Sequence, residues 1–86
     1  QLVLYDKETG RKMTMTTTLP CIQVYTGNFL SGGCNGKGGK PYENRDGVAL
    51  EAQFLPNSIH IEKEPKVHLR KGEEYEAVTT YRFEVE

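Results

Sequence analysis

Residues 75–85, with the sequence YEAVTTYRFEV, carry the clearest structural signal in the chain. Their aromatic, apolar and small side chains recur at every second position, which is the repeat of a β-strand. The pattern predicts a strand with one face in a core and one mostly in water, as in an antiparallel sheet. The predicted core face is Tyr75, Ala77, Thr79, Tyr81, Phe83 and Val85; the opposite face is Glu74, Glu76, Val78, Thr80, Arg82 and Glu84.

The same repeat of two recurs toward the N-terminus. Residues 2–6 (LVLYD) and 12–18 (KMTMTTT) flank the turn KETG, which ends at Gly10, and this arrangement predicts a β-hairpin. Met13 and Met15 fall on one face of its second strand. Further strands are predicted within residues 21–27 (CIQVYTG) and 48–54 (VALEAQF), because β-branched and aromatic residues are enriched there.

The segments between these strands read as irregular. Residues 30–47 hold most of the glycines, residues 55–66 are bounded by Pro56 and Pro65, and the chain turns at Gly72. No window has the repeat of an amphipathic helix. Four or five strands joined by long loops predict an all-β antiparallel β-sandwich, or part of one.

Size and charge narrow the class of protein. The chain has 86 residues, 36% hydrophobic and 27% charged, with a net charge of −1. This is the composition of one soluble globular domain at most, and no apolar run has the length of a membrane span. Basic and acidic residues are interleaved, so neither nucleic acid nor a membrane surface is an expected partner. A chain that begins and ends in predicted strands is expected to be a segment of a longer domain.

Cysteines, histidines and glycines offer no strong motif. Cys21 and Cys34 do not form a C-x-x-C pair, and two sparse thiols favour a reducing, cytoplasmic location with both thiols free, although a bridge between them remains possible. Together with His60 and His68 they match no zinc spacing. Nothing favours a cysteine nucleophile with a histidine base. The glycine-rich loop breaks the phosphate-binding pattern at Pro41, so a flexible connection is expected.

Glu51 raises a chemical question, because it lies in the middle of an otherwise apolar predicted strand. Glu51 and Gln53 share one face of that strand, and Gln23 and Tyr25 share one face of theirs. If the two strands are neighbours, a carboxylate, two amides and an aromatic ring come together. This set suits a sugar. Amides and carboxylates form hydrogen bonds with its hydroxyls, and an aromatic ring covers the apolar face of the pyranose. On composition alone, a solvated sheet face remains the favoured interpretation of Glu51.

Three blocks of the chain resemble a known family. They are IQVYTGNFLSG, GKGGKPYENRDGVALEAQFLPNS and LRKGEEYEAVTTYRFEV, and in this order and spacing they look like the closing third of an aldose 1-epimerase of the galactose mutarotase type. The resemblance extends over nearly the whole chain. It implies that residues 1–86 are the C-terminal segment of a single mutarotase-like β-sandwich domain several times longer than this chain.

The resemblance also implies a reaction. Members of the family interconvert the α and β anomers of free aldoses such as galactose and glucose, with no cofactor and no metal. The general base of the family falls on Glu51, and a glutamine that contacts the sugar falls on Gln23. Tyr25, in the same motif, and Gln53 are candidate substrate-binding residues on the shared polar face. Such a base takes the proton of the anomeric hydroxyl while an acid protonates the ring oxygen.

The resemblance leaves the acid unaccounted for. In the family it is a histidine from an earlier part of the chain, and neither His60 nor His68 lies in a matching segment. The missing part is therefore an expected partner, and the 86-residue chain alone is expected to be inactive. A non-catalytic carbohydrate-binding domain and a purely structural segment are the alternatives; action on hexose 6-phosphates ranks lower. Ala52 and Lys71 depart from the family pattern and leave the preferred aldose open.

Overall fold

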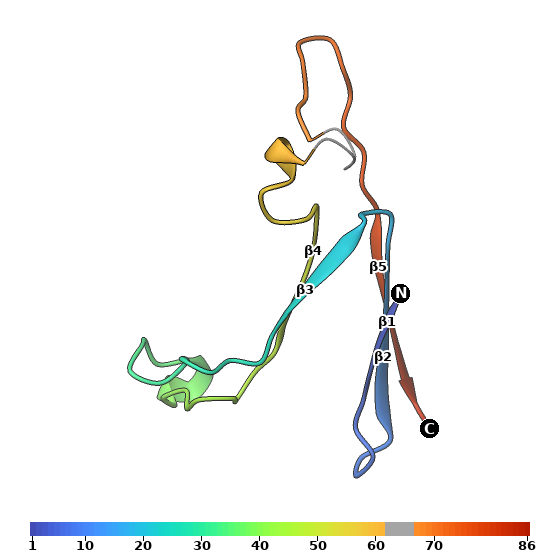
Figure 1. The fold of residues 1–86 in the computed structure, drawn as a ribbon. Coiled ribbons are helices and arrows are strands. Elements are labelled where there is room, and N and C mark those ends of the chain that lie inside the picture. The colour runs from blue at the N-terminus through green and yellow to red at the C-terminus, as the bar shows by residue number, and fades with distance from the viewer. Residues whose placement is uncertain (62–66) are drawn as a thin grey trace. The chain divides into compact units, whose positions relative to one another are not determined.

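The computed structural model describes residues 1–61 and 67–86 and contains five β-strands (Figure 1). The segment EKEPK and the boundary at Pro65 lie outside the described residues. Within them there is no α-helix and no helix able to cross a membrane, only the short 3-10 helices η1 (Lys37–Gly39) and η2 (Ser58–His60). The strands are β1 (Leu2–Tyr5), β2 (Arg11–Thr17), β3 (Cys21–Tyr25), β4 (Ala49–Gln53) and β5 (Thr79–Val85).

The chain divides into two compact units, each with a small sheet of its own. One unit comprises residues 1–21 and 52–86 and contains a three-stranded sheet with the strand order β1-β2-β5. The other comprises residues 22–51 and contains most of β3 and β4, which form a two-stranded sheet. The prediction of an all-β chain is therefore confirmed.

The three-stranded sheet is antiparallel throughout, and its register fixes which side chains share a face. Met13 lies opposite Leu4 on β1 and opposite Phe83 on β5. Two residues along, Met15 lies opposite Leu2 and Tyr81. The hairpin and the shared face of the two methionines are thus confirmed, and this face is the apolar one.

The hairpin turn between β1 and β2 is fixed by Asp6 and Gly10. The Asp6 side chain accepts hydrogen bonds from the Thr9 hydroxyl and the Glu8 N–H. Gly10 has a φ of 72°, and its N–H donates to the Asp6 carbonyl oxygen across 2.9 Å. A β-carbon at Gly10 would lie 2.4 Å from the carbonyl oxygen of Glu86, so glycine is required for two reasons.

The prediction that the last strand includes residues 74–78 was wrong, because β5 begins at Thr79. The reason is its partner. The last contact beyond β2 joins Thr18 to Val78, through the Thr18 N–H to the Val78 carbonyl and the Val78 N–H to the Thr18 hydroxyl. The chain that follows β2 then bends away at Leu19 and Pro20. Because a strand requires a partner for its backbone groups, β5 does not extend further toward the N-terminus.

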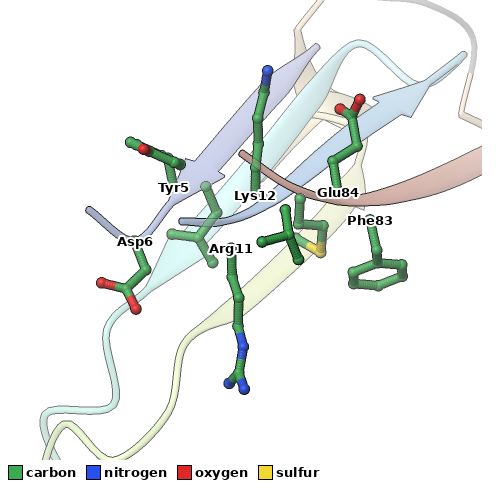
Figure 2. Close-up of a pocket in the computed structure, with 9 residues that line it drawn as sticks. Tyr5, Asp6, Arg11, Lys12, Phe83 and Glu84 are labelled. Carbon is green, nitrogen blue, oxygen red and sulfur yellow. The ribbon is translucent and has the colours of Figure 1, made fainter. Parts of the chain in front are cut away.

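The apolar face has almost no cover within the described residues. Met15 is the one large hydrophobic side chain there that is fully buried, whereas the side chains predicted for the core include Phe83 and Val85, which are 74% and 76% exposed. An open pocket of about 680 Å³ lies against the sheet beside Leu4 and Met13 (Figure 2). From Thr79 onward the pattern therefore predicted correctly which side chains share a face, but it did not predict that most of these side chains are exposed.

Candidate functional site

The strands that carry the candidate site residues are neighbours. β3 holds Gln23 and Tyr25, β4 holds Glu51, and the two strands form one two-stranded sheet. The sugar-site hypothesis required these two strands to be neighbours, and they are. All three residues belong to the unit of residues 22–51. Gln53 is the last residue of β4 and is half-buried in the other unit.

Glu51 occupies the centre of β4 and its side chain is exposed. No described residue forms a hydrogen bond or an ion pair with its carboxylate. A carboxylate in water has no desolvation cost to offset, which explains why the strand tolerates it. Gln23 is exposed and equally without a described partner, so its amide and the Glu51 carboxylate keep their full capacity to bind an incoming polar molecule.

Tyr25 differs from these two residues because its hydroxyl already has a partner. Its side chain is half-buried, and its hydroxyl oxygen accepts the backbone N–H of Phe29 across 3.1 Å. This contact fastens the end of β3 to the turn that follows it. An accepted hydrogen bond leaves the O–H free to donate, so the contact does not prevent Tyr25 from binding a substrate oxygen.

The loop that joins β3 to β4 is pinned at its base. The Arg45 N–H donates to the Gly27 carbonyl oxygen across 2.7 Å, and the Arg45 Nε donates to the Asn28 Oδ1 across 3.3 Å. A β-carbon on Gly27 would lie 2.6 Å from the Gly47 carbonyl oxygen. The two ends of the loop therefore meet at a point that only glycine allows.

Further contacts hold the interior of this loop. The Ser31 N–H donates to the Asn44 side chain across 3.0 Å, and the Glu43 N–H donates to the Asp46 carboxylate across 2.9 Å. The loop is irregular, as predicted, but it is internally hydrogen-bonded. The sequence signal for this was the cluster Glu43–Asn44–Arg45–Asp46–Gly47, whose Asn and Asp side chains commonly bond to nearby backbone groups.

The remaining candidates do not assemble into a site. Cys21 and Cys34 are both free thiols. His60 lies in η2, His68 lies in irregular chain, and both are exposed. Among residues 1–61 and 67–86, no three or more His, Cys, Asp or Glu side chains are grouped so that they could hold a metal ion.

Comparison with known proteins adds the family to this geometry. The family model described as Aldose 1-epimerase matches residues 1–82. Galactose mutarotase of Homo sapiens is 43% identical over 82 residues, which cover 95% of this chain and 24% of that protein. Aldose 1-epimerase of Escherichia coli (strain K12) is 43% identical over 74 residues, covering 84% of this chain and 21% of that protein.

The chain spans about a quarter of the length of the curated relatives that it matches. Galactose mutarotase of Sus scrofa is 45% identical over 76 residues and shows the same partial coverage, 88% of this chain against 22% of that protein. No solved structure matches the chain at a significant level. Since one family model extends over nearly every residue described here, the chain belongs to the aldose 1-epimerase family.

Proposed function

We propose that this chain supplies one side of the active site of an aldose 1-epimerase, with Glu51 as the general base and Gln23 as a sugar ligand. The observation that carries the proposal is the pairing of β3 with β4, which makes the strands of Gln23 and Glu51 neighbours in one sheet. Membership of the aldose 1-epimerase family supports the reaction class. The substrate class is the free aldoses, such as galactose and glucose.

The proposed reaction is ring opening and closure by acid–base catalysis. Glu51 removes the proton of the anomeric hydroxyl while an acid donates a proton to the ring oxygen, so that the bond from C1 to the ring oxygen breaks and the open aldehyde forms. Rotation about the C1–C2 bond exposes the other face of the carbonyl group. Closure with both proton transfers reversed gives the other anomer, and no atom is gained or lost.

The acid comes from outside this chain in the proposal. We assign it to a histidine of a preceding segment, which would complete a large antiparallel β-sandwich with residues 1–86. Two observations support a missing partner: the chain spans about a quarter of its curated relatives, and most of its apolar sheet face is exposed. The free thiols of Cys21 and Cys34 are compatible with a cytoplasmic location.

Tyr25 and Gln53 have secondary roles in this proposal. Tyr25 contributes its ring and its O–H to the sugar while its oxygen holds the turn at Phe29. Gln53 follows Glu51 by two positions on β4, where alternation along the strand directs both side chains to the same side.

The first experiment is polarimetry on fresh α-D-galactose, with and without the 86-residue chain. We expect no acceleration of anomer exchange by the chain alone. The proposed reaction needs both a base and an acid, and in this proposal the chain supplies only the base. A rate above that of the buffer, abolished by Glu51→Gln, would show that the chain needs no external acid and would contradict the proposed division of the site.

The second experiment restores the missing part. The 74 matched residues of this chain replace their counterpart in the Escherichia coli relative, and the hybrid is assayed by polarimetry. Glu51→Gln in the hybrid should lower kcat by roughly 10²- to 10⁴-fold, whereas the matched control Glu43→Gln in the loop should leave kcat nearly unchanged. An active hybrid that is insensitive to Glu51→Gln would overturn the assignment of the base. Saturable galactose binding by an inactive hybrid would favour a carbohydrate-binding role.

A further inference from the structure

The loop between β3 and β4 is too long to set the register of the two strands by itself. It comprises residues 26–48, whereas the turn of a hairpin fixes the register only when it is short. The register must therefore come from contacts at the base of the loop. A slip of one residue would turn Glu51 to the face opposite Gln23, so these contacts matter for the candidate site.

The base of the loop indicates which residues of the two strands lie opposite each other. Gly27 approaches Gly47 so closely that a β-carbon on it would lie 2.6 Å from the Gly47 carbonyl oxygen. The end of β3 thus meets the beginning of β4, so the strands run antiparallel. Pairing these five-residue strands over their full length places Gln23 opposite Glu51. The two glycines continue the same register, since each lies four positions beyond one of these residues.

A side-chain contact fastens the loop just beyond this pair of glycines. The Arg45 Nε donates to the Asn28 Oδ1 across 3.3 Å, and the same oxygen accepts the Thr26 hydroxyl across 3.5 Å. The Arg45 N–H also donates to the Gly27 carbonyl oxygen across 2.7 Å. Arg45 is therefore joined to the chain that follows β3 through its backbone and through its side chain. The Asn28–Arg45 hydrogen bond forms the clasp of this loop.

The backbone of Arg45 indicates that its side chain is used. Its φ is 68°, in the left-handed region that glycine adopts without strain and other residues adopt at a cost. Strain of this kind persists where the surrounding contacts hold it, and it is common at functional sites. Asn57, the other non-glycine residue with a positive φ in the described part of the chain, has a φ of 62° and lies outside this loop.

We propose that Arg45 and Asn28 are positioning residues for the general base: their clasp holds β4 in the register that places Glu51 opposite Gln23. The inference rests on the proposed function, because it gives the clasp an effect on catalysis through Glu51. A base must lie within hydrogen-bond reach of the proton that it removes, so a displaced strand lowers kcat. A slip of two residues would move Glu51 by about 7 Å along the strand.

Arg45→Gly in the hybrid with the Escherichia coli relative tests the proposal. This change removes the clasp and relieves the backbone strain, so the urea midpoint should not fall. We expect kcat for α-D-galactose to fall roughly tenfold. Arg45→Lys, which keeps a donor on a side chain of similar length, should recover part of this loss. Asn57→Gly relieves the other positive φ and is the matched control, with kcat unchanged. A native kcat in Arg45→Gly, or a loss no greater than in the control, would overturn the proposal.

Two double variants of the hybrid show whether the clasp acts as a unit and through Glu51. Adding Asn28→Ala to Arg45→Gly should cause little further loss of kcat, because the hydrogen bond is already gone. Adding Arg45→Gly to Glu51→Gln should likewise change the residual rate little. The same roughly tenfold loss in the Glu51→Gln background would mean that Arg45 acts independently of the base, which contradicts a positioning role.

NMR of the isotopically labelled 86-residue chain tests the register without catalysis. Opposite residues of an antiparallel pair have Cα atoms about 4.5–5.5 Å apart, so cross-strand NOEs should join Gln23 to Glu51. These NOEs should weaken in Arg45→Gly and persist in Asn57→Gly. Unchanged NOEs in Arg45→Gly would refute the clasp even where Glu51 proves to be the base. Weakened NOEs together with a hybrid insensitive to Glu51→Gln would refute the proposed function and leave the clasp's control of the register standing.

Discussion

The Tyr25 hydroxyl accepts the backbone N–H of Phe29 across 3.1 Å and so joins a strand of the candidate site to the loop beside it. This single contact links the proposed sugar-binding face to the geometry of the following turn. Phe29 itself is 86% exposed, so its position depends on its backbone rather than on packing of its ring.

Replacing Tyr25 by phenylalanine should loosen this turn without unfolding the strand. Loss of the hydrogen bond costs about 1 kcal/mol, which corresponds to roughly fivefold faster hydrogen exchange of the Phe29 amide. The measurement is amide exchange by NMR. Tyr42→Phe is the control, because the Tyr42 hydroxyl forms no hydrogen bond with a described residue. Equal acceleration in both variants would contradict the role assigned to Tyr25.

Truncating Met15 should destabilise the three-stranded sheet more than truncating Met13. Met15 is fully buried and Met13 only half-buried, although both lie on the same face of β2. Methionine-to-alanine changes at buried sites cost about 2–5 kcal/mol, so Met15→Ala should unfold much of a marginal sheet. Urea unfolding followed by circular dichroism gives both midpoints. A lower midpoint for Met13→Ala would show that the apolar face is covered in solution.

Adding a methyl group at Gly10 should be worse than adding one at Gly32. Both residues have positive φ, 72° and 85°, so alanine is strained at either by about 1–2 kcal/mol. At Gly32 the new atom meets nothing within 4 Å, whereas at Gly10 it would lie 2.4 Å from the Glu86 carbonyl oxygen. Gly10→Ala should therefore lower the urea midpoint further than Gly32→Ala and weaken the pairing of β5 with β2. Equal midpoints would contradict this close approach.

The hairpin turn should respond to acid through Asp6. The hydrogen bond from the Thr9 hydroxyl, followed by that from the Glu8 N–H, lowers the pKa of Asp6 below its ordinary value of 3.8. A lowered pKa in the folded state contributes stability above the unfolded value. This contribution starts to be lost as the pH falls below about 4 and is gone below the folded pKa.

NMR titration of the Thr9 and Glu8 amides between neutral pH and about pH 2 measures this effect. Their shifts should follow the protonation of Asp6, with a midpoint below that of an unstructured peptide of the same sequence. Asp6→Asn removes the titrating group and is the control. A midpoint at or above the peptide value would mean that the turn does not favour the ionised carboxylate.

The sequence predicted which residues form strands better than it predicted where β5 begins or which side chains are buried. Within residues 79–85, alternation identified which side chains share a face, and it matched the register that places Met13 opposite Phe83. The same pattern could not reveal that β5 begins only at Thr79. That limit is set where the chain bends away after β2, at Leu19 and Pro20. Nor could it tell whether a face with an apolar composition is covered, since burial depends on what packs against it.

In the candidate site, too, the regular strands were predicted from the sequence and the contacts of the loop were not. The spacing of Gln23, Tyr25 and Glu51 placed them on two strands that proved to be neighbours. The contact between Arg45 and Asn28 was not predicted, because it joins residues 17 positions apart through a loop with no repeat. Periodicity reports on regular elements alone, whereas the hydrogen bonds of an irregular loop depend on its three-dimensional path.

The position of β5 also determines the order in which this chain can fold. Thr17 and Thr79 bond through their hydroxyls across 3.0 Å, although they are 62 positions apart in sequence. Closing so long a loop carries an entropic cost before any contact repays it, which slows folding. During synthesis the β1–β2 hairpin emerges before β5, so β2 must wait for this partner strand. Until β5 arrives, the side of β2 that it will occupy remains unpaired, and unpaired strand edges make a folding intermediate prone to aggregation.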